Sequence, residues 1–418
     1  MKRLVVCCDG TWKAESSTTV SNIIKIAQTI AFDAPGPNGE QIQQWVSYVS
    51  GPGARGFLAD RLMGGAFGLG LEANLSAAYW HLALNWEPGD QIYIFGFSRG
   101  AYTARSLAGL INRVGILTPE AMIRGVYPKA MQLYRTPAPA DGSVPPEWKQ
   151  FRKLNSPHRV KIDFLGVFDT VGALGVPGLS SFLHGFHDVK LPSIVHCARQ
   201  ALAIDERRRA FEPCLWDVPV EPNVKYRKRF ERVKQVWFEG VHSDIGGGYE
   251  QCGLSDITLR WMIREAEEVG LVFDKARLER LAKDCRGCDD HLELHDSLSM
   301  AYRVLNLIRT VRRPRNPRFH WNSWRRLSVP TDQCVRLASS AQDVADYRPP
   351  NVRDWREELG GMFPEELIEK TGAGSAHSAD ERGSADQQGD GQPGEQLLQP
   401  GAALEGVAGQ PIGPVALR

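Results

Sequence analysis

The stretch QIYIFGFSRGAYTARSLA, residues 91–108, decides the fold. An apolar run at 91–95 leads into Gly96-Phe97-Ser98-Arg99-Gly100, and a helix-like segment begins at Ala101. A strand, a tight turn and a helix in this order are typical of a turn that holds a serine in a strained conformation at a helix N-terminus. The two glycines are expected to let neighbouring backbone approach closely. The alternative is a serine in an ordinary strand–helix turn.

Three more apolar runs end at polar or glycine-rich residues. Residues 4–8 precede Asp9-Gly10-Thr11, residues 160–168 precede Asp169, and residues 233–238 precede Glu239-Gly240-Val241-His242. Helix-like segments lie between the runs, at 21–30, 71–84, 101–114 and 255–269. Apolar strands that alternate with helices predict an α/β fold, with a mostly parallel central sheet, helices on both faces and insertions. The ligand crevice of such a sheet lies beyond the carboxyl ends of its strands.

Composition places the chain among folded proteins without a membrane span. Of the 418 residues 42% are hydrophobic and 24% charged, and the net charge of +1 predicts no nucleic-acid partner. The longest apolar runs are far shorter than the roughly 20 residues that cross a bilayer. After Lys2 and Arg3 only five apolar residues precede Asp9, too few for a signal peptide. The eight cysteines form no regular disulfide framework, so a reducing, cytoplasmic location is expected.

Residue 371 marks a change in composition. Residues 371–418 contain ten Gly, four Pro, six acids against two Arg, and no aromatic residue. This acidic Gly/Pro/Gln-rich segment is predicted to be a disordered tail, because it has too little apolar surface to form a core. Residues 1–370 are predicted to form one large domain with insertions, and a second small domain within them stays open.

A catalytic serine needs a histidine that takes its proton and a carboxylate that orients the histidine. In the predicted fold they follow the serine in the order acid, then histidine. Asp169 and His242 meet this order, since both lie just past apolar strands. The rival acids are Asp244 and Asp205, with Asp163 less favoured because it lies inside its strand. The other histidines compete less well, at His158, His184, His187 and His377.

The oxyanion that forms during acyl transfer needs backbone N–H donors. We expect one from Arg99, which follows the serine, and one from Gly10 or Thr11 in the loop after the first strand. Asp9 could equally cap a turn in this loop. No metal or cofactor is expected: Cys285 and Cys288 form a CxxC, but with neighbouring His291 and His295 a polar, solvated loop is favoured over a metal site.

Two further segments stand out. Residues 51–70 hold seven glycines among large apolar residues, which fits either a lid or acyl-chain wall or a buried connection. Residues 302–326 hold eight arginines and no acid, interleaved with aromatic residues. This patch fits a membrane interface or an anionic ligand, RNA, or merely a solvated basic face. Its candidate residues are Arg312, Arg313, Arg315, Arg318, Trp321 and Trp324.

Taken together, the segments 8–12, 96–101, 168–172 and 241–249 resemble an uncharacterised α/β-hydrolase domain family that includes the catalytic domain of type VI secretion phospholipase effectors. Residues 203–208 and 347–351 also match, so the resemblance covers roughly residues 1–350. It implies an α/β-hydrolase fold and ester hydrolysis, with phospholipid as the substrate of the secreted members. Carried over residue by residue, it places the triad on Ser98, Asp169 and His242.

The sequence therefore predicts a serine esterase or lipase that hydrolyses carboxylic esters, phospholipids among them, through an acyl-enzyme and without a cofactor. One alternative is a catalytically inactive scaffold that binds a lipid or a protein, and another is a deacylase of polysaccharide or peptide. The expected partners are an ester or lipid substrate, a membrane surface and, for a toxin, an immunity protein. A type VI-like route would export the chain without a signal peptide.

Overall fold

The computed structural model describes residues 1–10, 19–36, 38–51, 66–137, 139, 143–171, 190–218, 231–284, 292–312, 324–327, 334–342, 344, 346–359 and 365–368. All of them belong to the compact unit Met1–Lys370, and Thr371–Arg418 forms a second unit. The prediction of a disordered tail at 371–418 lies outside the described residues.

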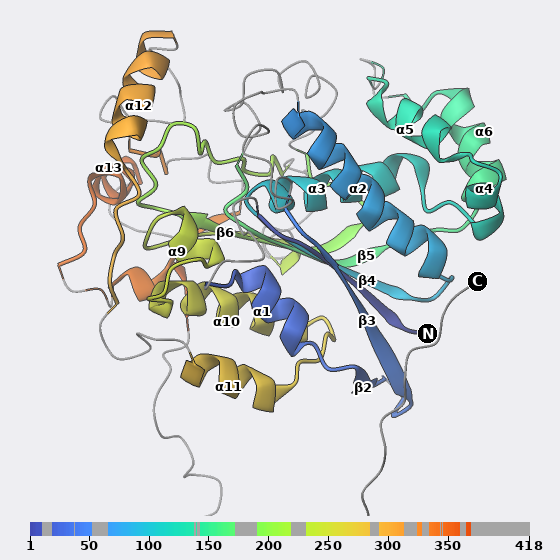
Figure 1. Ribbon diagram of the computed structural model, residues 1–418, viewed down its shortest axis with the longest axis horizontal. Helices are drawn as coiled ribbons and strands as arrows, with labels where there is room; N and C mark the ends of the chain where they lie inside the picture. The colour runs from blue at the N-terminus through green and yellow to red at the C-terminus, as the bar shows by residue number, and fades with distance from the viewer. Residues whose placement is uncertain are drawn as a thin grey trace, which may run out of the picture. The chain divides into compact units, whose positions relative to one another are not determined.

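A nine-stranded sheet runs through the first unit in the order β2-β3-β1-β4-β5-β6-β7-β8-β9 (Figure 1). Only the pair β2·β3 is antiparallel, and every other neighbouring pair is parallel. The carboxyl ends of the parallel strands therefore gather at one edge of the sheet. The strands are β1 (Arg3–Cys8), β2 (Asp33–Pro35), β3 (Gln41–Val49), β4 (Gln91–Phe97), β5 (Ile162–Phe168), β6 (Val195–Ala203), β7 (Val233–Phe238), β8 (Val335–Ala338) and β9 (Glu365–Glu366).

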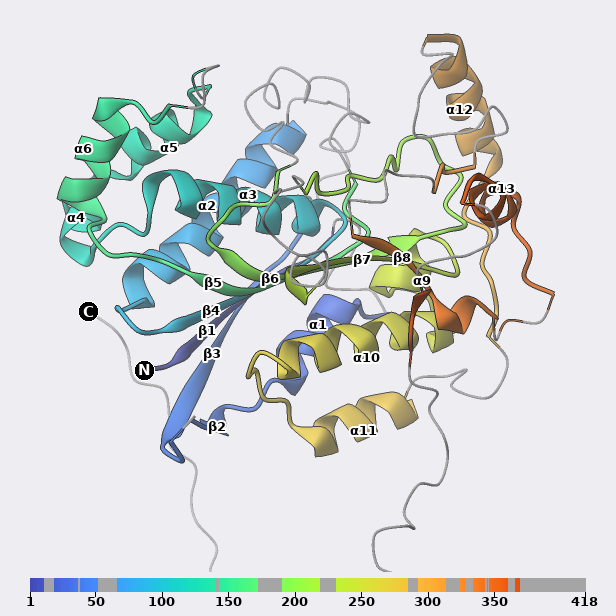
Figure 2. The same cartoon turned by 180° about the vertical axis from the view of Figure 1, so that it is seen from behind.

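Helices cover both faces of the sheet (Figures 1 and 2). One face carries α2 (Ala66–Asn85), α3 (Arg99–Val114), α4 (Pro119–Ile123), α5 (Tyr127–Arg135) and α6 (Pro146–Asn155). The opposite face carries α1 (Asn22–Thr29), α10 (Gly253–Glu267) and α11 (Lys275–Asp284). Side chains of β1 alternate between two separate cores, with Leu4 and Val6 in the first and Val5 and Cys7 in the second. The predicted α/β-hydrolase-like class, a mostly parallel sheet between helices, is confirmed.

The predicted strands and helices are all present, but five of the nine described strands were not predicted, and β6 is the one that lies between two predicted strands. The sequence of β6, VHCARQALA, is rich in residues that favour helices and carries a charge. It is nevertheless a strand because β5 and β7 pair with it on both sides. The buried Arg199 in this strand forms an ion pair with the buried Glu265 of α10, which compensates its charge.

The remaining elements follow β7. They are α9 (His242–Gly246), α12 (Met300–Arg312), the 3-10 helix η4 (Ser339–Gln342) and α13 (Pro350–Glu358). A third apolar cluster, which includes Trp237 of β7, Leu337 of β8 and Trp355 of α13, joins this part of the chain to the sheet. Among the described residues, no helix has the length and apolar character needed to cross a membrane.

Candidate active site

Ser98 lies between the end of β4 and the start of α3. Its backbone has φ 57° and ψ −119°, a conformation that non-glycine residues rarely adopt and that costs of the order of 1–3 kcal/mol. The Ser98 N–H donates to the Phe168 carbonyl oxygen of the neighbouring strand over 3.0 Å, which holds the turn against β5. The predicted strand–turn–helix arrangement is therefore present, and its strain falls on the serine.

The two glycines of this turn are required by close packing. A Cβ on Gly96 would lie 2.6 Å from the Ala101 Cα, and one on Gly100 would lie 2.5 Å from the Asp9 carbonyl oxygen. Real Cβ atoms do not approach that closely, so Gly96 leaves room for the first turn of α3, and Gly100 lets that turn rest on the end of β1.

Ser98, His242 and Asp169 form one hydrogen-bonded chain at the carboxyl edge of the sheet. The His242 Nε2 lies 2.8 Å from the Ser98 Oγ, and its Nδ1 lies 2.6 Å from the Asp169 Oδ2. All three residues are buried, with Asp169 completely inaccessible. With its proton on Nδ1, the imidazole donates to the carboxylate and leaves Nε2 free to accept the serine proton.

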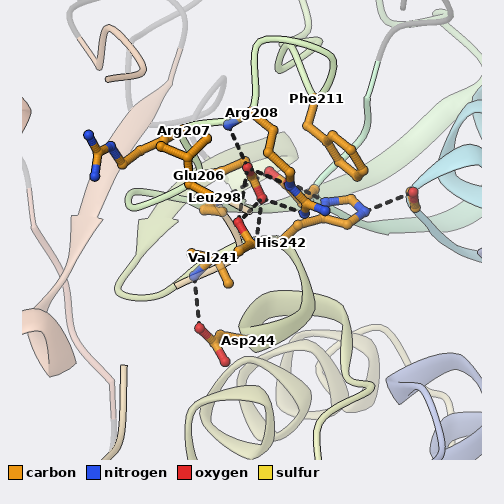
Figure 3. Close-up of polar contacts among 12 residues, drawn as sticks. Glu206, Arg207, Arg208, Phe211, Val241, His242, Asp244 and Leu298 are labelled. Carbon is orange, nitrogen blue, oxygen red and sulfur yellow. Dashed lines mark hydrogen bonds and ion pairs between the residues drawn. The ribbon is translucent and has the colours of Figure 1, made fainter. Parts of the chain in front are cut away.

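Aromatic rings and a second carboxylate hold His242 in place. The rings of Phe97 and Phe211 each lie 4.8 Å from the imidazole, centroid to centroid. The His242 backbone N–H donates to the buried Glu206 over 3.3 Å, and the Arg208 guanidinium donates to both oxygens of that carboxylate (Figure 3). Burial lowers the pKa of His242, although Asp169 opposes the shift, so the net pKa lies below its ordinary value.

Asp169 occupies a strained position of its own, with φ 36°. Its Oδ1 accepts the Ala203 N–H over 3.1 Å and the Arg325 Nη1–H over 2.6 Å, and its Oδ2 accepts the Arg325 Nη2–H over 3.0 Å. Burial raises the pKa of Asp169, but the Arg325 charge and the His242 hydrogen bond outweigh it and bring the net pKa below its usual range. Asp169 is therefore ionised.

The rival acids have other partners. Asp244 accepts the Val241 N–H over 2.9 Å and contacts the His295 Nδ1 over 2.7 Å. Asp205 accepts the Gly240 N–H and the Tyr347 hydroxyl, and Asp163 accepts the Ile92 N–H. In the part of the chain that the structure describes, no hydrogen bond joins these three carboxylates to the His242 ring.

The expected oxyanion donors are placed only in part. Arg99 begins α3 directly after Ser98, so its backbone N–H lies in the first turn of the helix. Gly10 lies beside Ser98, because a Cβ built on Gly10 would be 3.3 Å from the Ser98 Cβ. Its N–H, however, donates to the Asp9 carboxylate over 2.7 Å. Thr11 lies outside the described residues.

Arg325 was not predicted as a site residue. It belongs to the basic run 302–326, from which a surface patch was expected, yet its side chain is completely buried against Asp169. Trp324, its neighbour, is half-buried with the Arg207 guanidinium 5.0 Å from its ring. Of the other patch candidates, Arg312 ends α12, and Arg313, Arg315, Arg318 and Trp321 lie outside the described residues.

Two other expectations also fall mostly on residues that are not described. Of the glycine-rich segment 51–70, the structure describes only residue 51 and the start of α2. Cys285, Cys288 and His291 lie outside the described residues, whereas His295 pairs with Asp244. Within the described ranges, no group of three or more His, Cys, Asp or Glu side chains is placed to hold a metal ion.

The family model described as "T6SS, Phospholipase effector Tle1-like, catalytic domain" matches residues 2–265 of the chain. An uncharacterised protein of Saccharomyces cerevisiae is 31% identical over 251 residues, which cover 53% of this chain. The match spans only 34% of that curated relative.

Two solved structures are also similar to the chain. The first is a Tle1 effector bound to the VgrG spike of a type VI secretion system, with 16% identity, a TM-score of 0.42 and coverage of 77% of this chain and 81% of the other. The second is an uncharacterised protein from Pseudomonas aeruginosa, with 17% identity, a TM-score of 0.33 and coverage of 70% and 51%.

Proposed function

Because the chain belongs to the family of Tle1-like phospholipase effector catalytic domains, we propose that it is a serine esterase that hydrolyses carboxylic esters of lipids, phospholipids among them. The observation that carries the proposal is the buried chain from the Ser98 Oγ through His242 to Asp169, with links of 2.8 and 2.6 Å. These separations lie within the range over which a base can take the serine proton.

The reaction would proceed in two acyl transfers. The Ser98 Oγ attacks the ester carbonyl carbon while the His242 Nε2 takes its proton, and the leaving alcohol departs with that proton. Water then attacks the acyl-enzyme, gives a proton to Nε2 and releases the carboxylic acid, and the proton returns to the Ser98 Oγ. Asp169 keeps the imidazole in the correct tautomer and stabilises the imidazolium in both steps. The Arg99 and Gly10 amides are the proposed oxyanion donors, and the Gly10 amide would first have to leave Asp9.

Covalent labelling with a fluorophosphonate tests this mechanism. An activated serine attacks the phosphorus, fluoride leaves, and the modified peptide is identified by mass spectrometry. We expect one adduct on the Ser98 peptide of the wild-type protein and none in a folded Ser98→Ala variant. A folded wild-type protein that remains unlabelled would contradict the proposal and favour the inactive binding scaffold.

Substrate panels then separate the remaining alternatives. Release of fatty acid from phospholipid vesicles by the wild-type protein, and not by Ser98→Ala, would support the lipid assignment. Hydrolysis of acetylated sugars or peptides with intact phospholipid would favour the deacylase instead.

The outer face of α12 supports a lipid surface as the place of action. Met300, Val304 and Leu307, spaced four and three residues apart, are 76%, 57% and 66% exposed and share one side of the helix. The helix contains three arginines and no acid, as expected for a segment that meets anionic headgroups. Its other side contacts the site: the Asn306 Oδ1 accepts the Arg209 N–H over 2.9 Å, and the Tyr302 ring lies 6.1 Å from the Phe211 ring.

Vesicle sedimentation tests this surface. The triple variant Met300→Ser, Val304→Ser and Leu307→Ser should bind vesicles that contain phosphatidylserine at least tenfold more weakly than the wild-type protein. Ile123→Ser on α4 is the control, because Ile123 is 86% exposed and lies on another helix. Equal binding by the wild-type and triple-variant proteins would remove α12 from the proposal.

The proposals of an export route and of an immunity partner are supported only by membership of the family. We propose a type VI-like export route and, if the protein is a toxin, an immunity protein that blocks its site. The wild-type protein, directed to the periplasm of a bacterial host, should then be toxic to that host, and the Ser98→Ala variant should be harmless to it. Harmless periplasmic expression of active enzyme would contradict the toxin role.

A further inference from the structure

The Asp169 carboxylate is held by a two-pronged contact with Arg325. The Arg325 Nη1–H donates to Oδ1 over 2.6 Å and the Nη2–H to Oδ2 over 3.0 Å, so the guanidinium plane faces both oxygens. A paired contact of this kind fixes the orientation of a carboxylate as well as its position. The same Oδ2 also accepts the His242 Nδ1–H, so the direction in which Asp169 meets the imidazole is set from the arginine side.

Arg325 itself is anchored from three parts of the chain. Its guanidinium also donates to the carbonyl oxygens of Ala203, at the end of β6, and of Phe211. Its own carbonyl oxygen accepts from the Asn351 side chain, which simultaneously donates to the Ile204 carbonyl oxygen. Asn351, in the first turn of α13, is buried. The arginine thus belongs to a buried hydrogen-bonded network rather than to the solvated surface.

This arrangement changes the charge that surrounds the imidazole. The charged groups around His242 come from three places: Asp169 after β5, Glu206 and Arg208 after β6, and Arg325 from residues 324–327. Each of the two carboxylates is paired with one guanidinium, because Glu206 binds Arg208 and Asp169 binds Arg325. A buried imidazole therefore faces two neutralised pairs instead of a net negative charge.

Arg325 and His242 also stand close to each other. The Arg325 Nη2 and the His242 Nδ1 both lie within 3.0 Å of the same carboxylate oxygen. The Arg325 guanidinium is a fixed positive charge so close to His242 that it disfavours a second positive charge on the imidazole.

We propose that Arg325 is a positioning residue of the triad, which fixes Asp169 towards His242 and keeps the imidazole unprotonated, and so able to act as a base, in mildly acidic conditions. The proposal rests on the proposed function, since it assigns Arg325 a part in the same triad. Arg325 acts through its contact with Asp169 and through its charge beside His242, without touching the substrate.

The test is the pH dependence of Ser98 labelling. The second-order rate constant for fluorophosphonate labelling is measured from about pH 4 to about pH 9 for the wild-type protein and for Arg325→Met, Arg325→Gln and Arg325→Lys. Without the positive charge, the Met and Gln variants should lose reactivity about one pH unit higher than the wild-type protein, and their plateau should fall at least about tenfold. The Lys variant keeps the charge but not the two-pronged contact, so its plateau should fall while its acid limb stays in place.

Arg199→Met is the matched control. Arg199 is a buried arginine paired with a buried glutamate, like Arg325, but it lies in β6 and binds Glu265 of α10. Its loss should lower the midpoint of thermal unfolding without moving the acid limb. An acid limb that stays in place in a folded Arg325→Met or Arg325→Gln variant, or that moves equally in Arg199→Met, would overturn the inference.

A second measurement covers the case in which neither neutral variant folds. The ring nitrogens of His242 are titrated in wild-type protein labelled with ¹⁵N-histidine. Protonation below the ordinary value of about pH 6.5 is expected, and protonation at or above that value would overturn the inference. The proposed function fails separately, through absence of wild-type labelling at any pH.

Discussion

The structure holds two aspartate–histidine pairs, His242 with Asp169 and His295 with Asp244, and they differ in what surrounds them. His242 contacts Asp169 over 2.6 Å, and His295 contacts Asp244 over 2.7 Å, each through Nδ1. Both carboxylates are buried. By these distances alone, either pair could serve as the base of a serine esterase.

The surroundings separate the two pairs. The Nε2 of His242 faces the Ser98 Oγ, and the imidazole is enclosed by Phe97 and Phe211. The ring of His295 instead stacks on Tyr249, with 3.9 Å between centroids and 14° between planes. Asp169 is bound by an arginine, whereas Asp244 accepts the Val241 N–H, immediately before His242. A short aspartate–histidine contact therefore marks a histidine as a candidate base. The partner of its other ring nitrogen then indicates whether it can take a proton from a serine.

The largest expected effect comes from removing the serine or its base. Ser98→Ala or His242→Ala should each reduce kcat for an ester substrate about 10⁶-fold, because each removes the nucleophile or the group that activates it. The double variant should be no worse than either single variant, since the two residues act as a unit. Steady-state hydrolysis of a chromogenic ester measures this. A loss of kcat below about tenfold in either variant would contradict the assignment of Ser98 and His242, and not the His295 pair, to the reaction.

The two carboxylates should differ next. Asp169→Asn should lower kcat about 10⁴-fold, because an amide facing His242 favours the wrong tautomer. Asp244→Asn should cost less than about tenfold, since its side-chain oxygen can still accept the Val241 N–H. Similar losses in the two variants, measured with the same ester, would mean that the pairs cannot be told apart by their surroundings.

The pH dependence sharpens the role of His242. Only a neutral imidazole accepts the serine proton, so activity falls as the pH drops through the His242 pKa. Burial lowers that pKa below its ordinary value of about 6.5. The acid limb of kcat/KM should therefore have its midpoint below about pH 6.5. A midpoint above that value would mean that Asp169 raises the pKa of His242 by more than burial lowers it.

The smallest expected effect belongs to the second pair. His295→Ala removes the imidazole that contacts the buried Asp244 and the stack on Tyr249, so the free energy of unfolding should fall by about 1–3 kcal/mol. Urea denaturation measures this change. The kcat of the folded variant should stay within about threefold of the wild-type value, and a loss comparable to that of Asp169→Asn would assign His295 to the reaction.

Local patterns were enough to predict much of this architecture. The apolar runs at 91–95 and 233–238, each with polar residues after it, place Ser98 and His242 at strand ends because parallel strands share one carboxyl edge. Strand β6 was missed because its alanines and its arginine do not look like a strand, and only its neighbours make it one.

Arg325 was missed for a different reason. In the sequence it is one arginine among eight in a run without acids, and nothing local separates the buried one from the others. Its burial depends on a carboxylate 156 residues earlier in the chain. Local composition cannot report an ion pair that only the folded chain creates.

The position of Arg325 also affects where the functional unit ends. The match to the family model ends at residue 265, and it contains Ser98, Asp169 and His242. The arginine that holds Asp169 and the asparagine that holds this arginine come later, at 325 and 351. A boundary drawn at the limit of recognisable similarity would divide the site, keeping its reactive groups and discarding the residues that orient them. For this fold the working unit extends at least through α13, which ends at Glu358.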